Sequence, residues 1–273
     1  MKNFTEDTFV IFDVETTGLS PIGGDRIIEL AALKIENLAP VAHFHSFINP
    51  HREISSGAFA VNGITAEMLA DSPSAREILP DLLDFLGEDI LVGHNIKFDL
   101  AFLQREIFLA KLSWKENPTA ICTVKMSRAF LPEIGRYPLW LIAQTLGIEA
   151  SQEHRALSDV HLTWEVFRRL LALAQRRDIN ESETLARLFA VVQNPEQEKK
   201  IKEHLSLIER AIEFKKTILI SYFSSSQGAM TFRKVHPQKI VKEKGRVKLL
   251  GFCHLRQQDR SFRLDRIFDL TAE

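Results

Sequence analysis

The amino-acid sequence predicts an α/β domain followed by a smaller all-β domain. Three observations support this prediction. Short apolar runs alternate with amphipathic helical stretches through most of residues 1–177, and short β-rich runs follow from Thr217 onward. The net charge also changes sign, from −7 over residues 1–180 to +6 over the rest of the 273-residue chain. An acidic part can gather carboxylates around cations, whereas a basic part can meet phosphate.

Strands and helices alternate in the first part of the chain. The run FVIFDV at residues 9–14 is typical of a buried strand that ends in a turn at Thr16, Thr17 and Gly18. A helix is expected over residues 75–86, because capping residues precede it and apolar residues recur at helical spacing. Further expected strands are RIIELAALKIEN, HFHSFINP and ILVGHN, and further expected helices are NIKFDLAFLQREIFLAKL, YPLWLIAQTLGI and HRALSDVHLTWEVFRRLLALAQRR.

The polar stretch RRDINESE places the expected domain boundary near Asp178. We expect a first domain over residues 1–177, a linker over 178–200, and a second domain over 201–273 that begins with an amphipathic helix. About five strands are expected in the second domain, separated by the turns SSSQG, KEKG and RQQD. The strand candidates are TILISYF, MTFRKVHP, KIVKEKG, RVKLLGFCHL and SFRLDRIFDL.

The composition, with 45% hydrophobic and 26% charged residues, is that of an ordinary globular protein. No apolar run is long enough to cross a membrane, and the first residues lack the pattern of a signal peptide. Cys122 and Cys253 lie far apart in unlike surroundings, which argues against a disulfide framework and against a cysteine metal site. We therefore expect a soluble cytoplasmic protein.

Two carboxylates lie at the end of the first expected strand. Strand alternation points Asp13 and Glu15 to one side and Val14 to the other. Like charges side by side on a buried strand repel, and they become tolerable when a cation lies between them. Hard divalent ions such as Mg²⁺ prefer oxygen ligands, so the pair suggests a metal site.

Three more polar residues lie at the ends of expected elements. Asp99 follows a strand, where ligands bind in open α/β sheets, and His154 and Asp159 stand about one and a half turns apart near the start of a helix. Each feature alone has an ordinary explanation: helix capping by Asn95 or Asp99, or solvated carboxylates and histidine at element ends. The interpretation of these residues as one functional site rests on their position at the ends of expected elements, in one order, inside otherwise apolar segments.

The segments FDVETTGL, GHNIKFDLAFL and HRALSD resemble the three exonuclease motifs of the DEDD superfamily, in its histidine-bearing DEDDh branch, which includes the proofreading subunits of bacterial replicative polymerases. The resemblance implies a ribonuclease-H-like fold, a mixed sheet flanked by helices. It implies two divalent ions, Mg²⁺ or Mn²⁺, held by Asp13, Glu15, Asp99 and Asp159, with His154 as the general base. The implied product is a nucleoside 5′-monophosphate.

The same resemblance suggests substrate contacts. It points to Thr16, Thr17, Gly18 and Leu19 for the terminal sugar and base, and more weakly to three other residues. Asn62 stands where proofreading subunits often carry a histidine, so the chain departs from the pattern there. The three further candidates are Asn62, Asn95 and Phe98.

The order of ILISYF, FRKVHPQKIV, RVKLLGFCHLR and SFRLDRI resembles a WYL domain, a small module with an SH3/Sm-like barrel, although Val247, Lys248 and Leu249 replace the naming tripeptide. Residues 214–273 carry a net charge of +8. Arginines near aromatic residues suit single-stranded nucleic acid or a nucleotide ligand, and an ordinary solvated basic face is the alternative. The candidate ligand residues are Arg256, Arg260, Arg263 and Arg266.

Together these features predict a 3′-to-5′ exonuclease acting on single-stranded 3′ ends, with DNA favoured over RNA. An exoribonuclease of the same branch would share the five catalytic residues, and contacts to the 2′-hydroxyl would distinguish the two. A regulatory binding protein without catalysis is the rival from another class. Retention of all four carboxylates and the histidine argues against that rival. A polymerase or repair partner is compatible with either enzyme.

Overall fold

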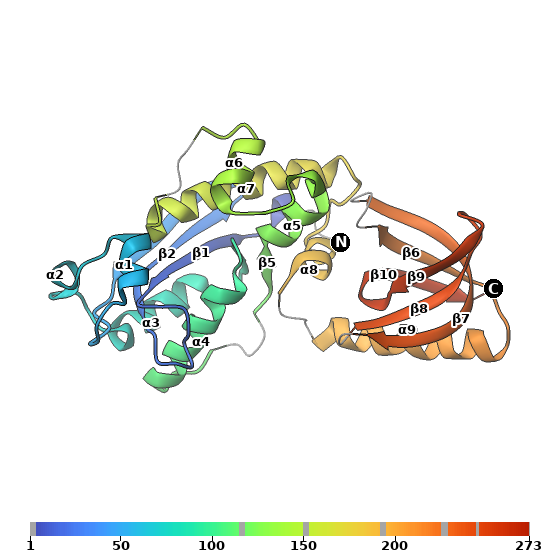
Figure 1. The fold of residues 1–273 in the computed structure, drawn as a ribbon, viewed down its shortest axis with the longest axis horizontal. Coiled ribbons are helices and arrows are strands. Elements are labelled where there is room, and N and C mark those ends of the chain that lie inside the picture. The colour runs from blue at the N-terminus through green and yellow to red at the C-terminus, as the bar shows by residue number, and fades with distance from the viewer. Residues whose placement is uncertain are drawn as a thin grey trace. The chain divides into compact units, whose positions relative to one another are not determined.

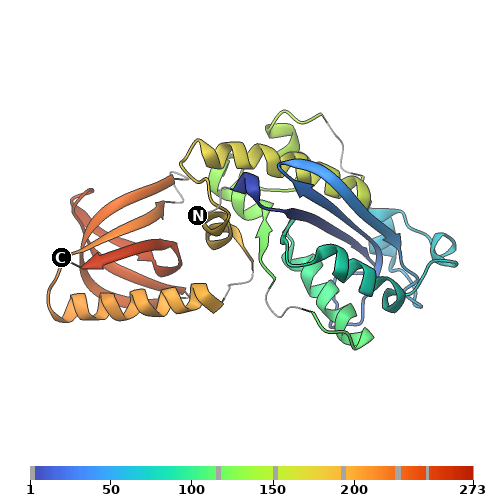
Figure 2. The same ribbon diagram turned by 180° about the vertical axis from the view of Figure 1, so that it is seen from behind.

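A computed structural model describes residues 4–114, 118–149, 153–191, 195–224, 229–243 and 246–272. The chain divides into two compact units (Figures 1 and 2). The first comprises Met1–Ala172 and Phe189–Val192, and the second comprises Leu173–Leu188 and Gln193–Glu273. Each unit has its own apolar core and is described separately.

The first unit is built on a mixed sheet whose described strands lie in the order β3-β2-β1-β4-β5. The central strand β1 pairs antiparallel with β2 and parallel with β4, and β5 continues the parallel part. Its apolar run is buried at both faces, whereas the edge strand β3 is largely exposed. The strands are β1 Phe9–Thr16, β2 Ile27–Glu36, β3 Ala39–Phe47, β4 Ile90–Gly93 and β5 Ala120–Cys122.

Helices cover both faces of this sheet, as Figure 1 shows. Even-numbered residues of β1 such as Phe12 pack in one core with α3 and α4. Odd-numbered residues face α7, where the rings of Phe9 and Phe167 meet at 5.2 Å. The helices are α1 Ser56–Asn62, α2 Ala66–Leu69, α3 Ala75–Leu86, α4 Lys97–Ala110, α5 Thr123–Phe130, α6 Leu139–Thr145 and α7 Ala156–Gln175, with short 3₁₀ turns η1 Phe4–Glu6 and η2 Pro132–Ile134.

The second unit is a curved antiparallel sheet of order β10-β6-β7-β8-β9. Helix α9 packs on it, and its Ile208 is buried with Ile218, Val235 and Phe262. Arg187 of α8 donates to the carbonyls of β10 and lies 4.1 Å from the Phe268 ring. The elements are α8 Ser182–Phe189, α9 Pro195–Glu213, β6 Ile218–Ser224, β7 Ala229–Glu243, β8 Arg246–Cys253, β9 Gln258–Arg263, η3 Leu264–Arg266 and β10 Ile267–Ala272.

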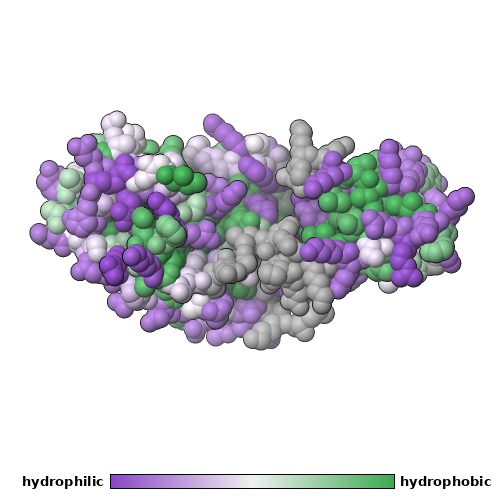
Figure 3. Space-filling view, turned by 90° about the horizontal axis from the view of Figure 1, so that it is seen from below, coloured by the Kyte–Doolittle hydropathy of each residue, from purple (hydrophilic) through white to green (hydrophobic). Residues whose placement is uncertain are grey.

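The surface of the second unit includes a broad hydrophobic area in the view of Figure 3. Among the large apolar residues of the second unit, Phe232 is 82% exposed and Phe214 is 64% exposed. None of the helices in the described ranges is long and apolar enough to span a membrane.

Several elements differ from those expected. The runs MTFRKVHP and KIVKEKG form the single strand β7, because an irregularity near Pro237 bends the strand without ending it. The run SFRLDRIFDL is divided by η3 into β9 and β10. Strand β5 and helix α5 had no counterpart among the expected elements. The turn SSSQG lies mostly, and KEKG partly, outside the described residues.

The expected linker at residues 178–200 is not an extended connection in its described part. It holds α8 and the start of α9. Between them, Val191 donates its N–H to the Ala120 carbonyl at 2.9 Å, and Lys125 donates to the Ala190 carbonyl at 2.5 Å. Between α8 and α9 the chain therefore contacts the edge of the first sheet at β5, which has backbone groups to satisfy there.

Gly93, the last residue of β4, lies where β4 packs too closely against β1 to leave room for a side chain. A Cβ atom there would lie 2.9 Å from both the Phe12 carbonyl oxygen and the Ile96 side chain. We expect Gly93→Ala to lower the free energy of unfolding by about 1–3 kcal/mol through overpacking. Gly57 is a matched control, since a Cβ there meets nothing within 4 Å. Gly57→Ala should raise stability slightly, by about 0.5–1 kcal/mol, and thermal unfolding of both variants checks the pair.

Candidate active site

The end of β1 carries two partly buried carboxylates. Asp13 and Glu15 lie on the side of the sheet that faces α7, while Val14 is 5% exposed and belongs to the core on the other side. In the antiparallel register with β2, Glu15 stands opposite Glu29. Strand alternation thus places both carboxylates on one face, as expected from the sequence.

Asp99 reaches the same strand from α4. It lies in the first turn of that helix and is 3% exposed. Its Oδ1 accepts a hydrogen bond from the backbone N–H of Val14 at 3.3 Å. The turn between β4 and α4 includes Asn95 in the left-handed region with φ 61°, which suits asparagine. Asp99 therefore lies beside Asp13 and Glu15 although 84 residues separate it from Glu15 in the sequence.

His154 and Asp159 complete the cluster from α7. Asp159 is buried in the first turn of the helix, and His154 is exposed just before it, with φ 52°. Ligand atoms of Glu15, His154 and Asp159 all lie within 4.8 Å of one another. The five residues expected to be catalytic therefore come together from β1, α4, the first turn of α7 and the segment just before α7.

Burial, and at two positions neighbouring carboxylates, raise the pKa values of these carboxyl groups. Burial raises the pKa of Asp13 well above its usual value, and the charges of Asp99 and Asp159 raise it further. Burial also raises the pKa of Glu15 to about 8, although a hydrogen bond with Asn62 opposes this shift. The pKa of Asp99 rises to about 7, again through burial. Such shifts mark a site where several negative charges cannot all ionise unless a cation compensates them.

A cavity of about 640 Å³ adjoins Glu15. Its walls mix apolar side chains with small and polar ones. Of the residues expected to bind substrate, Thr17 and Asn95 are absent from its lining. Thr17 is fully buried, because its hydroxyl holds the following loop together. The lining residues that the sequence had suggested are Glu15, Thr16, Gly18, Leu19, Asn62 and Phe98.

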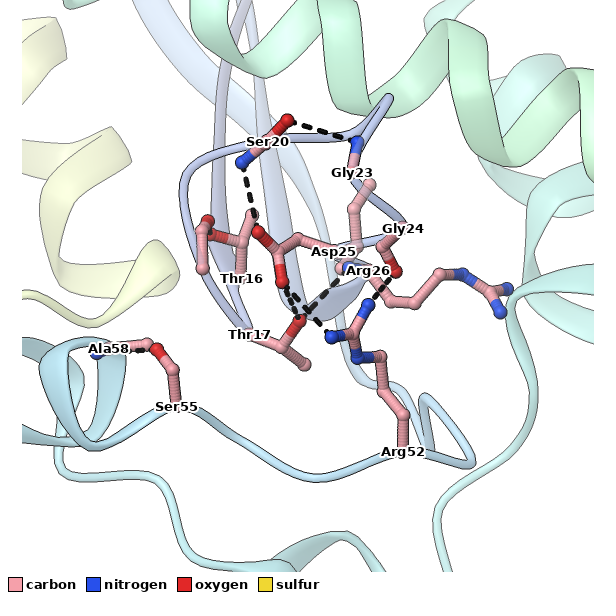
Figure 4. A network of polar contacts seen from close by, with 12 residues as sticks. Thr16, Thr17, Ser20, Gly23, Gly24, Asp25, Arg26, Arg52, Ser55 and Ala58 are labelled. Carbon is pink, nitrogen blue, oxygen red and sulfur yellow. Dashed lines mark hydrogen bonds and ion pairs between the residues drawn. The ribbon is translucent and has the colours of Figure 1, made fainter.

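The loop beside the cavity is fixed by a polar network drawn in Figure 4. Asp25 accepts hydrogen bonds from the Thr17 hydroxyl at 3.2 Å and the Ser20 backbone at 3.0 Å, and it pairs with Arg52 at 3.3 Å. Arg52 also donates to the Gly24 carbonyl. The exposed side chain of Leu19 is therefore presented at the cavity by a preorganised loop.

Asn62 has a structural part in this site. Its side chain is buried, donates to the Thr16 carbonyl at 3.4 Å and accepts from the backbone of Ile64 at 3.1 Å. Together with its hydrogen bond to Glu15, these contacts connect α1 to the end of β1.

His94, which follows β4, has a structural role. Burial lowers its pKa to about 4, so this histidine is a neutral link between the Thr123 hydroxyl and the Tyr137 carbonyl.

Comparison with known families identifies both parts of the chain. A family described as Exonuclease (RNase_T) matches residues 10–167, which is more than half of the sequence. The chain belongs to this exonuclease family. A WYL domain matches residues 203–272, so the C-terminal sheet and its leading helix form a domain of that kind.

Similar proteins include the DNA polymerase III PolC-type of Oceanobacillus iheyensis, 41% identical over 174 residues, and that of Bacillus subtilis, 37% identical over 181 residues. The aligned parts cover 62% and 66% of this chain, respectively, and 12% of each polymerase. The chain thus corresponds to a small part of these relatives.

Solved structures agree with this assignment. Exonuclease X in complex with 5′ overhanging duplex DNA covers 66% of this chain and 98% of its own, with a TM-score of 0.52 and 26% identity. Escherichia coli exonuclease I with a dT13 oligonucleotide covers 90% of this chain and 55% of its own, with a TM-score of 0.59. At 18% identity the second likeness supports the fold alone.

The four arginines suggested for the WYL domain have unlike surroundings. Arg256 and Arg260 are exposed, whereas Arg263 forms an ion pair with Asp265. Arg266 is partly buried and also has interactions within the chain. An ordinary structural role therefore accounts for Arg263, which leaves Arg256 and Arg260 as the accessible pair.

Sequence reasoning missed three further groups. Arg233 of β7 is 7% exposed, and its side-chain Nε donates to the Thr231 hydroxyl. Asp25 and Arg52 gave no sequence signal, because their pairing depends on two loops meeting. Glu29 did give one, since it is a charged residue inside the apolar run RIIELAALKI, which is typical of a buried and partnered carboxylate.

The raised pKa values predict a stability that depends on pH when metal is absent. Because these carboxyls bind protons more tightly in the folded state, they stabilise it below about pH 4.5, and this contribution is lost as the pH rises through about 7 to 8. In EDTA, the Tm of the exonuclease domain should fall between about pH 5 and about pH 8. Glu15→Gln removes one of these charges and should raise the Tm at the higher pH by about 2–4 °C.

Glu77→Gln is the control, because hydrogen bonds from Ser74 lower the pKa of Glu77 and its charged form is therefore favourable. That variant should give no increase in Tm. Identical pH profiles for wild type and Glu15→Gln would contradict the electrostatic account.

Proposed function

We propose that this protein is a metal-dependent 3′-to-5′ exonuclease that hydrolyses single-stranded nucleic acid and releases nucleoside 5′-monophosphates. One observation carries the proposal: carboxylates from β1, α4 and α7 lie together, Glu15 among them lines a cavity, and the exposed His154 lies within 4.8 Å of Glu15 and Asp159. Membership of the exonuclease family supports the same activity.

The donor set fits divalent metal ions. Burial raises the pKa of Asp13, Glu15 and Asp99, and neighbouring carboxylates raise the pKa of Asp13 and Glu15 further, so a bound cation would favour their charged forms. All four carboxylates offer the oxygen ligands that Mg²⁺ and Mn²⁺ prefer. We propose that Asp13, Glu15, Asp99 and Asp159 hold two such ions. When bound, the pair would stabilise charge on the attacking and leaving oxygens of an in-line displacement at phosphorus.

His154 is suited to accept the proton of the attacking water. It is exposed, and it lies close to Glu15 and Asp159 without being enclosed by them. Imidazole is the side chain most often used as a general base near neutral pH. The carboxylates would thus bind the metal ions, and the exposed histidine would transfer the proton.

The cavity beside Glu15 suits the terminal nucleotide. Leu19 and Phe98 offer apolar surface for a base, while Thr16, Gly18 and Asn62 border the end of β1. DNA is the favoured substrate, because the PolC-type relatives are DNA polymerases. RNA ends are the alternative substrate, and Asn95 remains a candidate contact outside the cavity lining.

The second domain would assist through nucleic-acid or nucleotide binding. We assign the exonuclease to residues 1–177 and the WYL domain to 201–273. The accessible Arg256 and Arg260 lie in a segment of net positive charge, and arginine binds phosphate through a planar fork of donors. A partner such as a polymerase or repair protein is compatible with this arrangement, and the same domain would recruit or regulate it.

The activity predicts a defined product pattern. Single-stranded DNA and RNA of one sequence, labelled at either end, should release labelled mononucleotide first from the 3′ end, in Mg²⁺ or Mn²⁺ but not in EDTA. Asp13→Ala and Asp159→Ala should reduce the rate at least about 10³-fold, because each removes a metal ligand. Circular dichroism checks that these variants fold.

The faster sugar type identifies the substrate class. Full activity in either alanine variant would contradict the site, and no metal-dependent release from any strand would favour the regulatory alternative.

The basic module predicts a change in salt dependence. Each phosphate contact to single strands contributes about 0.7 to the slope of log affinity against log salt. The double variant Arg256→Gln with Arg260→Gln should therefore bind single strands more weakly, with a slope reduced by up to about 1.4. Fluorescence anisotropy with a short oligonucleotide measures this slope, with Glu77→Gln as a charge-altered control in the other domain. An unchanged slope would remove these arginines from the binding surface.

A further inference from the structure

Glu29 is a buried carboxylate that the proposed reaction does not use directly. It lies near the beginning of β2, between β3 and the central strand β1, and its side chain is 1% exposed. Four donors surround it: His45 Nε2 at 2.8 Å, Arg155 Nε at 3.1 Å, Arg155 Nη2 at 3.2 Å and the backbone N–H of Ala156 at 3.2 Å. A buried charge needs this degree of compensation, and two of its partners belong to the beginning of α7.

Glu29 accepts a hydrogen bond from the backbone N–H of Ala156, the first residue of α7. The first four N–H groups of a helix lack acceptors within the helix, and a negative charge at that end is favourable. Here the acceptor comes from a residue 127 positions earlier in the chain. At the same point the Arg155 carbonyl accepts from the backbone of Asp159 at 2.9 Å. The bonds of Glu29 therefore determine where the helix that carries Asp159 begins.

His154 immediately precedes these anchored residues. Its φ of 52° lies in the left-handed region, which a residue other than glycine adopts when its surroundings fix it. Both following residues are fixed by Glu29. The guanidinium of Arg155 also lies 5.2 Å from the ring of Phe47 on β3, which restrains it from a second side. The direction of the His154 side chain toward Glu15 and Asp159 thus depends on what holds residues 155 and 156.

We propose that Glu29 is a positioning residue that sets the His154 imidazole and the first turn of α7 for the reaction. The inference rests on the proposed exonuclease function and goes beyond its five residues. Glu29 acts through Arg155 and Ala156, and it makes no contact with substrate. Its place opposite Glu15 in the β1–β2 register couples the strand that supplies two carboxylates to the helix that supplies the histidine.

Glu106 provides a matched comparison in the same domain. It is also buried, and it is held by Arg26 at 2.6 and 2.7 Å and by the Ile27 backbone at 3.3 Å. Both glutamates therefore combine an arginine fork with one backbone donor. Of the two glutamates, only Glu29 bonds to the residues that follow His154. Substituting each glutamate in turn therefore separates a loss of stability from a loss of His154 positioning.

The test compares Glu29→Gln with Glu106→Gln by steady-state kinetics on a 3′-labelled strand. Glu29→Gln should lower kcat about 10- to 100-fold, the size expected for a misplaced reacting group, with KM changed by less than about threefold. Glu106→Gln should lose stability yet keep kcat within about twofold. In a His154→Ala background, Glu29→Gln should lower kcat by a smaller factor than it does in wild type, because the part of its effect that acts through the imidazole is already lost.

A second measurement does not depend on activity or metal. Hydrogen exchange of the amides of residues 156–159 in EDTA should be at least about tenfold faster in Glu29→Gln than in wild type, and unchanged in Glu106→Gln. If wild type proves inactive, the exonuclease proposal fails, whereas faster exchange would still support the hold of Glu29 on α7. Arg155→Gln, which alters a partly exposed side chain, gives a milder variant should Glu29→Gln not fold.

Arg155→Gln should also lower kcat, and the factor by which it does so should likewise be smaller in His154→Ala than in wild type. Unchanged exchange at residues 156–159, wild-type kcat in a folded variant, or independent multiplicative effects with His154→Ala would each overturn the proposal.

Discussion

Burial of several carboxylates close together at the end of β1 is the constraint on which the rest of the exonuclease domain depends. Asp13, Glu15 and Asp99 are held so close and so deeply that each has a raised pKa. Folding alone would not favour this arrangement, because an apolar or neutral residue at any of these positions would cost less. The surrounding structure must therefore hold these residues in place, and a site of this kind is consistent with selection for binding cations.

The architecture meets this requirement from several directions. Pairing on both sides fixes β1, so its odd-numbered residues face α7 and cannot turn away. Asp99 is tied to the Val14 backbone, and Asn62 connects α1 to Glu15. On the neighbouring strand β2, Glu29 lies opposite Glu15 and anchors the beginning of α7. The loop over the cavity is closed separately by Asp25 and Arg52, so binding surface and charged centre are stabilised by different contacts.

Local pattern was enough to predict the strand carrying Asp13 and Glu15, the helix at residues 75–86 and the family motifs, because each depends on neighbours in sequence. Features that depend on distant segments meeting were not predictable. Thr17 belongs to the loop interior because Asp25 folds back on it, and Val191 returns to β5 across 71 residues. The division of SFRLDRIFDL by η3 follows from how Leu264 enters the core of the WYL domain. Apolar periodicity alone gives no sign of that turn.

The claim that these carboxylates bind cations is tested most directly by calorimetric titration of the 273-residue chain with Mn²⁺ near neutral pH. Carboxyls with pKa values of about 7 and 8 are partly protonated there, so metal binding should release protons. Repeating the titration in buffers of different ionisation enthalpy measures that release. The account predicts binding with net proton release that decreases in Glu15→Gln and Asp99→Asn. Binding without proton release, or no binding to the wild-type protein, would contradict it.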